Sequence, residues 1–361
     1  MDKIKVLHFF GKMDMGGAET FVLNLYRHID RNEVQFEFAV TNCEKGYYDE
    51  EIIKLGGEIH ILPYPKADLK KYKESLGKLL KQGNYDVVHS HVHYFSGVNL
   101  SVAKRNGVNI RIAHSHTYNH NRRFSLKRTL YEKCMRYLIY KSSTHFLACS
   151  REAANELFVN RCKMVEIVNN GIDIDRFSKK KYAKEEYKKA LNLPDDSFII
   201  GHIGGFRPEK NHSKLVDIFL EVLKVKKNAH LVMVGDGEKK SEIEALVRNL
   251  GIKDRVHFLG IRKDTENILA AFDTFVFPSF YEGLGIAVIE AQVSGLYCIV
   301  SDTLPKAVDI TSNVAFLSLD ADQGVWRDAI LFNNSKKKEI SMVRDFDIKC
   351  VCKHMYSFYS G

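Results

Sequence analysis

The sequence lacks several features that would set the protein apart from an ordinary globular protein. Its seven cysteines are scattered and form no CxxC pair, which argues against a zinc knuckle or a disulfide framework. No apolar run approaches the roughly 20 residues of a transmembrane helix. The opening stretch, MDKIKVLHFFGKMDMGG, reads as a strand and a turn and not as an export signal. We therefore expect a cytoplasmic chain with free, buried thiols that does not cross a bilayer.

Charge is unevenly divided along the chain. Residues 1–165 contain 26 Lys and Arg against 17 Asp and Glu, a net charge of +9, whereas the other 196 residues contain 28 of each. A basic half beside a neutral half indicates that one domain meets something anionic. No nucleic-acid-binding motif accompanies the charge, so we expect no nucleic-acid partner.

The segment 122–141 carries seven positive charges, one negative charge and apolar residues at roughly helical spacing. Two interpretations of it stay open. It is either a helix that lies on an anionic membrane surface, or a sheet-covering helix with a solvated basic face.

Short strand-like runs alternate with helix-length segments. The runs include KIKVLHFF, VQFEFAV, DVVHSH and NIRIAHSH, and after a charged stretch the pattern restarts with FIIGHIGG, HLVMVGD and TFVFPS. Such alternation predicts an α/β protein with two doubly wound, Rossmann-like domains of mainly parallel sheet. We expect a first domain at 1–175, a connection at 176–197 and a second domain at 198–344. Ligands of such folds bind at the carboxyl ends of the strands, and a cleft between the domains is the expected site.

Glycine-rich turns follow several strands and open helices. They are MGGAE (Met15–Glu19), GDGE (Gly235–Glu238) and EGLG (Glu282–Gly285). Glycine lets backbone N–H groups approach an oxyanion at a helix N-terminus. None of the turns forms GxGxxG with a ribose-binding acid about 20 residues on, which disfavours a nicotinamide dehydrogenase.

A carboxylate lies within the most apolar predicted helix. Glu290 falls in the helix Gly285–Gly295, eight positions after Glu282. A buried carboxylate without a partner costs several kcal/mol, so Glu290 needs a partner. A hydroxyl-rich ligand, an internal ion pair or a position at the surface edge would each satisfy it. The amides of Gly283, Leu284 and Gly285 could hold a phosphate between the two acids.

The stretch YEGLGIAVIEAQVSGLYCIVSD, with its Glu-x7-Glu spacing, resembles the signature of retaining GT-B glycosyltransferases of family four (glycosyl transferases group 1). GGAETFVLNL, ACSREAANELF, VNNGIDIDRF and the segment from HLVMVGD to TFVFPS resemble further motifs of that family, in the same order. The resemblance covers nearly the whole chain, and is greatest to the branch that assembles bacterial capsular and exopolysaccharides. It implies an acceptor domain, a donor domain facing it across a cleft, and a last helix at 345–361 that crosses back to the first domain.

The resemblance also implies roles for individual residues. Glu290 would accept hydrogen bonds from the ribose of the nucleotide, and Glu282 would bind hydroxyls of the transferred sugar. Lys210, in RPEKNH, would neutralise the diphosphate, where negative charge develops on the leaving group. Lys210, Glu282 and His116, the family's active-site histidine near the donor sugar, are the implied catalytic residues.

The remaining implied donor-site residues are mostly backbone contacts. Gly16 and Gly17 belong to the first glycine loop, where the Gly17 amide would bind the phosphates. The base would lie against the backbone near Ile261 and Arg262.

One position departs from the family pattern. Gly205 stands where the family usually carries an arginine that clamps the diphosphate. Arg207 lies two residues on, and side chains two apart on a strand share a face, so Arg207 is the candidate replacement.

Histidines are dense in two strand-like runs: His89, His91, His93, His114 and His116. Their spacing of two would also suit a metal. We expect most of them to be solvated or hydrogen-bonded, and only His116 to serve the site. Asp173–Asp175 imitates a DxD metal motif but lies at the domain junction, and the resemblance implies neither a divalent ion nor a cofactor.

The sequence thus predicts a metal-independent, retaining glycosyltransferase that works in the cytoplasm, with peripheral attachment to the inner face of the membrane as a further expectation. A UDP-sugar is the expected donor, and a glycan carried on polyprenyl diphosphate the expected acceptor. No residue reads as a covalent nucleophile, which favours front-face substitution. Two alternatives stay open: a nucleotide-sugar epimerase, and a non-catalytic nucleotide-sugar-binding subunit, which Gly205 motivates.

Overall fold

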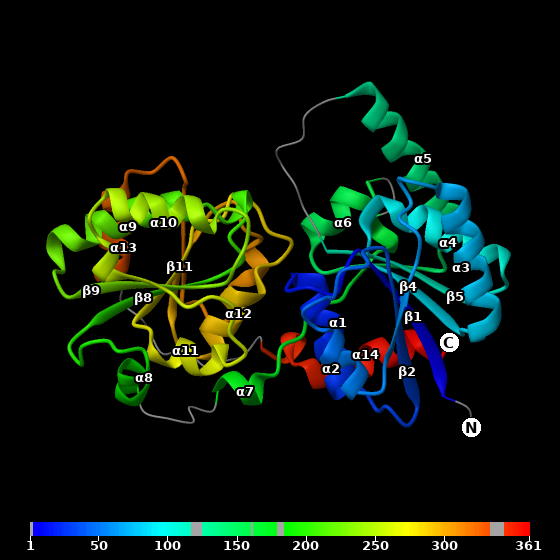
Figure 1. Ribbon diagram of the computed structural model, residues 1–361, viewed down its shortest axis with the longest axis horizontal. Coiled ribbons are helices and arrows are strands. Elements are labelled where there is room, and N and C mark those ends of the chain that lie inside the picture. The colour runs from blue at the N-terminus through cyan, green and yellow to red at the C-terminus, as the bar shows by residue number, and fades with distance from the viewer. Residues whose placement is uncertain (1–2, 117–124, 160–161, 179–183, 333–342) are drawn as a thin grey trace. The chain divides into compact units, whose positions relative to one another are not determined.

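The computed structural model describes residues 3–116, 125–159, 162–178, 184–332 and 343–361. The chain divides into two compact units (Figure 1). The first unit comprises Met1–Ile172 together with Asp345–Gly361, and the second comprises Asp173–Arg344.

The first unit is built on a seven-stranded sheet with the order β3-β2-β1-β4-β5-β6-β7. Neighbouring strands pair in parallel throughout the described part of this sheet. Its strands are β1 (Ile4–Phe10), β2 (Val34–Val40), β3 (Glu58–Ile61), β4 (Val87–Ser90), β5 (Ile110–Ser115), β6 (His145–Ala148) and β7 (Glu166–Ile167). Its helices are α1 (Gly17–His28), α2 (Asp49–Lys54), α3 (Leu69–Gly83), α4 (Ser96–Arg105), α5 (Leu126–Ser142), α6 (Arg151–Leu157) and α14 (Ile348–Tyr359).

Helices cover both faces of this sheet, which explains why its central strands are mostly buried, although they include the buried histidines His8, His89 and His114. One face packs against α1 and α14, through a cluster that includes Phe21, Phe36 and Met355. The other face packs against α3, α4 and α5. The last helix, α14, is held to the first unit at its start, where Ile348 N–H donates to the carbonyl of Ile172 (3.0 Å).

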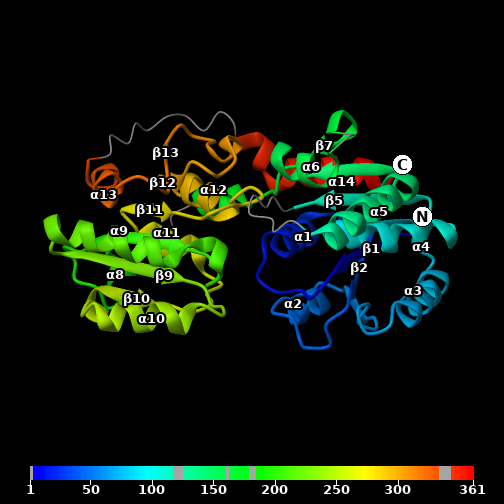
Figure 2. The same ribbon diagram turned by 90° about the horizontal axis from the view of Figure 1, so that it is seen from above.

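The second unit is built on a six-stranded parallel sheet with the order β10-β9-β8-β11-β12-β13, which Figure 2 shows from one edge to the other. Its strands are β8 (Phe198–Ile203), β9 (Ala229–Val234), β10 (Val256–Phe258), β11 (Thr274–Phe277), β12 (Tyr297–Ser301) and β13 (Val314–Leu317). Its helices are α7 (Ile174–Ser178), α8 (Lys184–Ala190), α9 (His212–Val225), α10 (Lys240–Asn249), α11 (Thr265–Ala271), α12 (Ile286–Val293) and α13 (Gln323–Leu331). Figure 1 shows α9, α10 and α13 over one face and α11 and α12 over the other.

The prediction of two doubly wound, parallel α/β domains is therefore confirmed. None of the described helices is both long and apolar enough to span a bilayer. All seven cysteines are free thiols, but the expectation that they are buried is wrong for Cys43 and Cys134, which are exposed. Cys43 lies in the loop after β2, and Cys134 lies in α5.

Candidate functional site

The segment that joins β11 to α12 in the second unit has the local structure that its sequence predicts. Gly285 precedes the helix with a φ of +92°, a left-handed conformation that favours glycine. Leu284 and most of α12 are buried, as the apolar sequence requires. The amides at the start of α12 therefore lie at the carboxyl end of β11, where an anion would be stabilised.

Glu290 in α12 is half-buried and makes no hydrogen bond or ion pair with another residue that the structure describes. Burial raises the pKa of Glu290 to about 7; the charge of Arg176 acts to lower this pKa, and that of Glu266 to raise it further. Arg176 does not pair with Glu290, because its guanidinium is engaged with Glu266 (2.6 Å). The sequence left three explanations open for Glu290, and one of them, an internal ion pair, is thus not formed.

Lys210 and Glu282, both predicted as catalytic, lie in direct contact. The Nζ of Lys210 donates to Oε1 of Glu282, and both side chains are largely buried, at 18% and 13% exposure. Lys210 follows β8 and Glu282 follows β11, and these two strands are neighbours in the sheet. The ammonium also lies 4.8 Å from the centre of the Phe277 ring. A basic and an acidic group are therefore held together where two strands end.

Arg207 lies beside Gly205, the position at which the expected arginine is missing. A Cβ at Gly205 would lie 3.8 Å from Nε of Arg207 and 3.9 Å from its Cγ. Its nearest neighbour would be the carbonyl of Asp236 at 3.4 Å, an ordinary contact, so a Cβ at 205 would fit. The side chain of Arg207 thus runs through the space next to Gly205.

Three glycine loops meet at the carboxyl edge of this sheet. The N–H of Gly235 donates to the carbonyl of Gly260 (2.8 Å). A Cβ at Gly235 would lie only 2.1 Å from the carbonyl oxygen of Gly204, so the loops after β8 and β9 approach as closely as glycine allows. Ile261 next to Gly260 is 44% exposed. Arg262 forms a bidentate pair with Asp264 (2.8 and 2.7 Å), which fixes its guanidinium within its own loop.

The first glycine loop belongs to the first unit, where Gly16 precedes α1 and Gly17 begins it. Glu19 folds back over this helix start, because a Cβ at Gly16 would lie 2.2 Å from Oε2 of Glu19. Glycine at 16 therefore leaves room for the acid.

Five histidines of the first unit form two hydrogen-bonded chains. In one chain, Nε2 of His91 lies 3.0 Å from Nδ1 of His8, and Nδ1 of His91 lies 2.8 Å from Nε2 of His116. In the other chain, Nδ1 of His89 lies 3.0 Å from the hydroxyl of Tyr359, and Nε2 of His89 lies 3.1 Å from Nδ1 of His114. His8 is not among the residues predicted from the sequence, although KIKVLHFF places it in the first strand; β1 pairs it directly with His89 of β4.

These imidazoles are neutral. Burial lowers the pKa of His8 and of His116 to about 3, and it lowers the pKa of the other three as well. Ring nitrogens of His8, His89 and His91, and likewise of His91, His114 and His116, lie within 4.8 Å of one another, which would allow a metal. The hydrogen bonds account for the same geometry without an ion, and metal independence stays a prediction.

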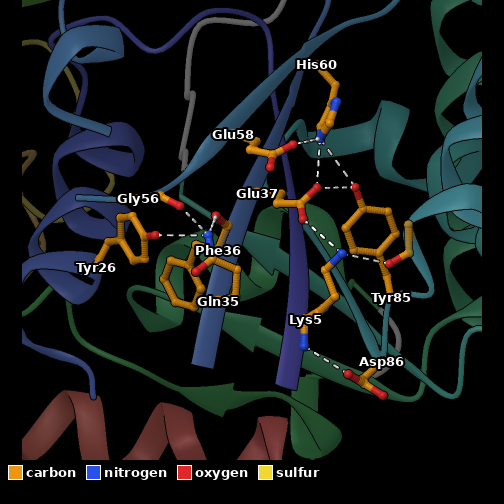
Figure 3. Close-up of polar contacts among 11 residues, drawn as sticks. Lys5, Tyr26, Gln35, Phe36, Glu37, Gly56, Glu58, His60, Tyr85 and Asp86 are labelled. Atoms are coloured by element: carbon orange, nitrogen blue, oxygen red, sulfur yellow. Dashed lines mark hydrogen bonds and ion pairs between the residues drawn. The ribbon is translucent and has the colours of Figure 1, made fainter. Parts of the chain in front are cut away.

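A second group with metal-like composition, Glu37, Glu58 and His60, lies across β2 and β3 (Figure 3). Glu37 accepts from Lys5 (3.1 Å) and His60 (2.7 Å) and from the hydroxyl of Tyr85. Burial alone would raise the pKa of Glu37, but the hydrogen bonds from these partners lower it to about 2. This carboxylate is satisfied within the protein, so the group is a structural ion network.

A cavity of about 210 Å³ lies at the ends of β1 and β2 in the first unit. Its polar lining includes Lys12, Asn42, Glu44 and Lys45. It contains none of the residues predicted for the donor site.

Solved structures share this architecture. Anabaena Alr3699/HepE, solved in complex with UDP-glucose, has a TM-score of 0.81 at 17% identity, covering 99% of each chain. WaaG, a glycosyltransferase involved in lipopolysaccharide biosynthesis, has a TM-score of 0.71 at 16% identity, covering 99% of this chain and 98% of its own. This protein therefore has the GT-B fold.

Sequence comparison identifies the family. Residues 15–176 match the model of Glycosyltransferase Family 4, and residues 183–323 match that of Glycosyl transferases group 1. The putative glycosyltransferase EpsF of Bacillus subtilis (strain 168) is 35% identical over 332 residues, covering 90% of this chain and 86% of its own. The chain belongs to this glycosyltransferase family, as the sequence motifs indicated.

Two further relatives have more specific names. The capsular polysaccharide biosynthesis glycosyltransferase CapH of Staphylococcus aureus is 28% identical over 368 residues, covering 99% of this chain and 98% of its own. The UDP-Gal:alpha-D-GlcNAc-diphosphoundecaprenol alpha-1,3-galactosyltransferase of Escherichia coli is 31% identical over 237 residues, covering 63% of this chain and 60% of its own.

Proposed function

We propose that this glycosyltransferase moves a sugar from a UDP-sugar, with retention of configuration, to a hydroxyl of a glycan carried on polyprenyl diphosphate, in capsular or exopolysaccharide synthesis. The main support for a donor site is Glu290, a half-buried carboxylate that has no partner among the described residues. Ribose hydroxyls would donate to it and so offset the cost of its burial.

Lys210, Glu282 and Arg207 are the proposed groups around the diphosphate and the transferred sugar. Lys210 would turn its ammonium to the leaving phosphate, which stabilises the negative charge that develops there. Glu282 would then accept from sugar hydroxyls in place of the lysine. Arg207 would supply the second cation from the space beside Gly205. His116 would lie near the donor sugar as a neutral imidazole, and Gly16, Gly17, Ile261, Arg262, Gly283, Leu284 and Gly285 would line the donor site.

The proposed reaction is a front-face substitution. The bond between the anomeric carbon and the diphosphate oxygen breaks, and the acceptor hydroxyl forms the new bond on the same face. Its proton passes to the leaving phosphate, so no protein nucleophile and no metal is needed. The anomeric configuration of the product, measured by NMR, tests retention directly.

The name of the E. coli relative specifies a diphosphoundecaprenol-linked acceptor, which supports the proposed acceptor. The name of CapH, a capsular polysaccharide biosynthesis glycosyltransferase, supports the proposed role in capsular or exopolysaccharide synthesis. The net charge of +9 in residues 1–165 would bring this half of the protein to an anionic membrane surface.

Thermal unfolding with UDP, GDP and ADP tests the donor site. A ligand at 100 times its dissociation constant adds about 2.7 kcal/mol to the free energy of unfolding, a shift of several degrees. We expect the shift with UDP, and its loss in Glu290→Ala. Glu242→Ala, which removes a 60% exposed acid of α10, is the matched control and should keep the shift. A shift that survives in Glu290→Ala would contradict the donor site.

Acceptor-free turnover separates the remaining alternatives. An epimerase would convert the UDP-sugar without an acceptor, and a non-catalytic subunit would bind UDP but release no sugar with any acceptor. We expect instead a UDP release that requires the lipid-linked acceptor.

A further inference from the structure

Arg176 lies in α7, at the start of the second unit, and α7 contacts both α11 and α12 (Figure 1). Two acceptors hold its guanidinium, which donates to Oε2 of Glu266 (2.6 Å) and to the carbonyl of Lys263. Both acceptors belong to one short segment, the loop after β10 and the first turn of α11. The guanidinium is therefore directed to α11, although it also exchanges electrostatic influence with Glu290 of α12.

Two buried acids thus lie near one arginine. The side chain of Glu266 is only 13% exposed and is paired. Glu290 is half-buried and has no hydrogen bond or ion pair with another residue that the structure describes. An ion pair with the nearby guanidinium would relieve the cost of burying Glu290. The structure instead gives the arginine to Glu266, the acid that lies outside the proposed donor site.

The other elements that pack closely against α12 bring no competing cation to Glu290 within the described ranges. Strands β11 and β12 contain no charged residue. The short 3-10 helix Lys306–Val308 contains one cation, Lys306, whose ammonium lies 3.5 Å from the centre of the Phe316 ring. The charges that act on Glu290 are those of Arg176 and Glu266. The position of the Arg176 guanidinium therefore decides whether Glu290 is paired.

We propose that Glu266 is a positioning residue for the donor nucleotide, because it holds the guanidinium of Arg176 at α11 and so keeps the carboxylate of Glu290 unpaired for the ribose hydroxyls. A guanidinium that turned to Glu290 would occupy the oxygens that ribose needs, and UDP would have to displace it. The bond to the carbonyl of Lys263 restrains the same guanidinium, next to the backbone at Ile261 and Arg262 where the base is proposed to lie. This inference deepens the proposed function and rests on it for the identity of the ligand.

Titration of the full chain with UDP at pH 8 tests the proposal. At this pH, above its pKa of about 7, Glu290 is mostly ionised. We expect Glu266→Ala to bind UDP about tenfold more weakly, because Arg176 then forms a charged hydrogen bond with Glu290 that competes with ribose. Adding Arg176→Met removes the competitor, so the double variant should bind UDP more tightly than Glu266→Ala does.

The matched control is Glu242→Ala. Glu242, like Glu266, is an acid in the first turn of a helix of the second unit, and it pairs with Lys239 at 2.6 Å. This variant should bind UDP as the unchanged protein does.

The double variant separates positioning from a merely structural role of the ion pair. If the pair only stabilised the contact between α7 and α11, removing both side chains would bind UDP no better than removing Glu266 alone. Glu266→Gln keeps the shape of the side chain and should change binding in the same direction, so it replaces the alanine variant where that variant does not fold. Equal binding by Glu266→Ala and the unchanged protein, or no gain in the double variant, would overturn the proposal.

Chemical denaturation without ligand measures the same pairing independently of UDP. In the unchanged protein, the raised pKa of Glu290 should make the folded state less stable as the pH rises from 5 to 8. In Glu266→Ala the guanidinium would keep Glu290 ionised over this range, so the contribution of Glu290 to the fall in stability should disappear. In the double variant it should return, and in Glu242→Ala it should be unchanged.

The two measurements distinguish failure of this inference from failure of the donor site. If the unchanged protein binds UDP and Glu266→Ala changes neither binding nor the pH dependence of stability, the role of Glu266 fails alone. If Glu266→Ala abolishes the fall in stability but the unchanged protein does not bind UDP, the donor site fails, while the control of Arg176 by Glu266 stands.

Discussion

Glu290 should make the ligand-free protein less stable at high pH while strengthening its binding of UDP. Its pKa is raised from 4.5 to about 7. The folded state therefore holds a proton that the unfolded state has already released, and stability falls as pH rises from 4.5 through 7. A difference of about 2.5 units corresponds to about 3 kcal/mol above pH 7. This is an upper figure, because the side chain keeps some contact with water.

The test is Glu290→Gln, which keeps the shape and removes the charge. We expect chemical denaturation without ligand to show the variant more stable than the unchanged protein at pH 8, by up to about 3 kcal/mol, with the difference gone below pH 4.5. UDP binding should behave oppositely. The unchanged protein should lose about tenfold in affinity between pH 8 and pH 6, as the carboxylate that accepts from ribose becomes protonated, and the variant should bind weakly at both pH values.

Glu242→Gln serves as the control, since this exposed acid should change neither stability nor binding. A Glu290→Gln variant as unstable at pH 8 as the unchanged protein would show that Glu290 is already satisfied within the protein. The argument for a ligand at this carboxylate would then be lost.

Three other perturbations test the remaining contacts. Lys210→Met and Glu282→Ala should each lower sugar transfer at least about 100-fold, and the double variant should lose clearly more than either one, because the two side chains would contact different parts of the donor; a double variant no slower than the single ones in initial rates would show that the pair acts only through its own contact. Arg207→Ala should weaken UDP binding and transfer, and Gly205→Arg added to it should restore both, since position 205 has room for a Cβ; failure of the rescue in a UDP titration would contradict the substitution of one arginine for the other. Glu37→Gln should lower the free energy of unfolding by about 3 kcal/mol at pH 7, and because the pKa of Glu37 is held at about 2, the loss should persist down to pH 4.5 and fade between 4.5 and 2; a difference that is independent of pH in urea titrations would exclude the ion network as its cause.

Much of the fold could be predicted from local sequence. Buried parallel strands read as unbroken apolar runs, and the segment Asp68–Gln82 carries Tyr72, Leu76 and Leu80 at helical spacing, which the structure places on the buried face of α3. The glycine before α12 was predictable for the same reason, because a strand that turns sharply into a helix often needs a left-handed residue.

The candidate site was predictable in its residues but not in their contacts. Arg176 influences Glu290, yet nothing near Arg176 in the sequence shows that Glu266 holds its guanidinium. His8 was overlooked, because a histidine in an apolar strand shows no partner until the neighbouring strand is known. The sequence also left open whether the helix within 122–141 covers a sheet, and only the packing of Met135 and Ile139 of α5 into the first unit decided that it does.

The sequence by itself determined two parallel-sheet units, the family, and which residues belong to its motifs, because hydrophobic period and motif order are local properties. Only the tertiary structure decided that Glu290 lacks a partner, that Lys210 meets Glu282 across 72 residues, and that Arg207 lies beside Gly205. The physical reason is strand order. Side chains that follow β8 and β11 meet because these strands are neighbours in the sheet. The packing of the whole unit decides which strands are neighbours, and no single stretch of the chain encodes it.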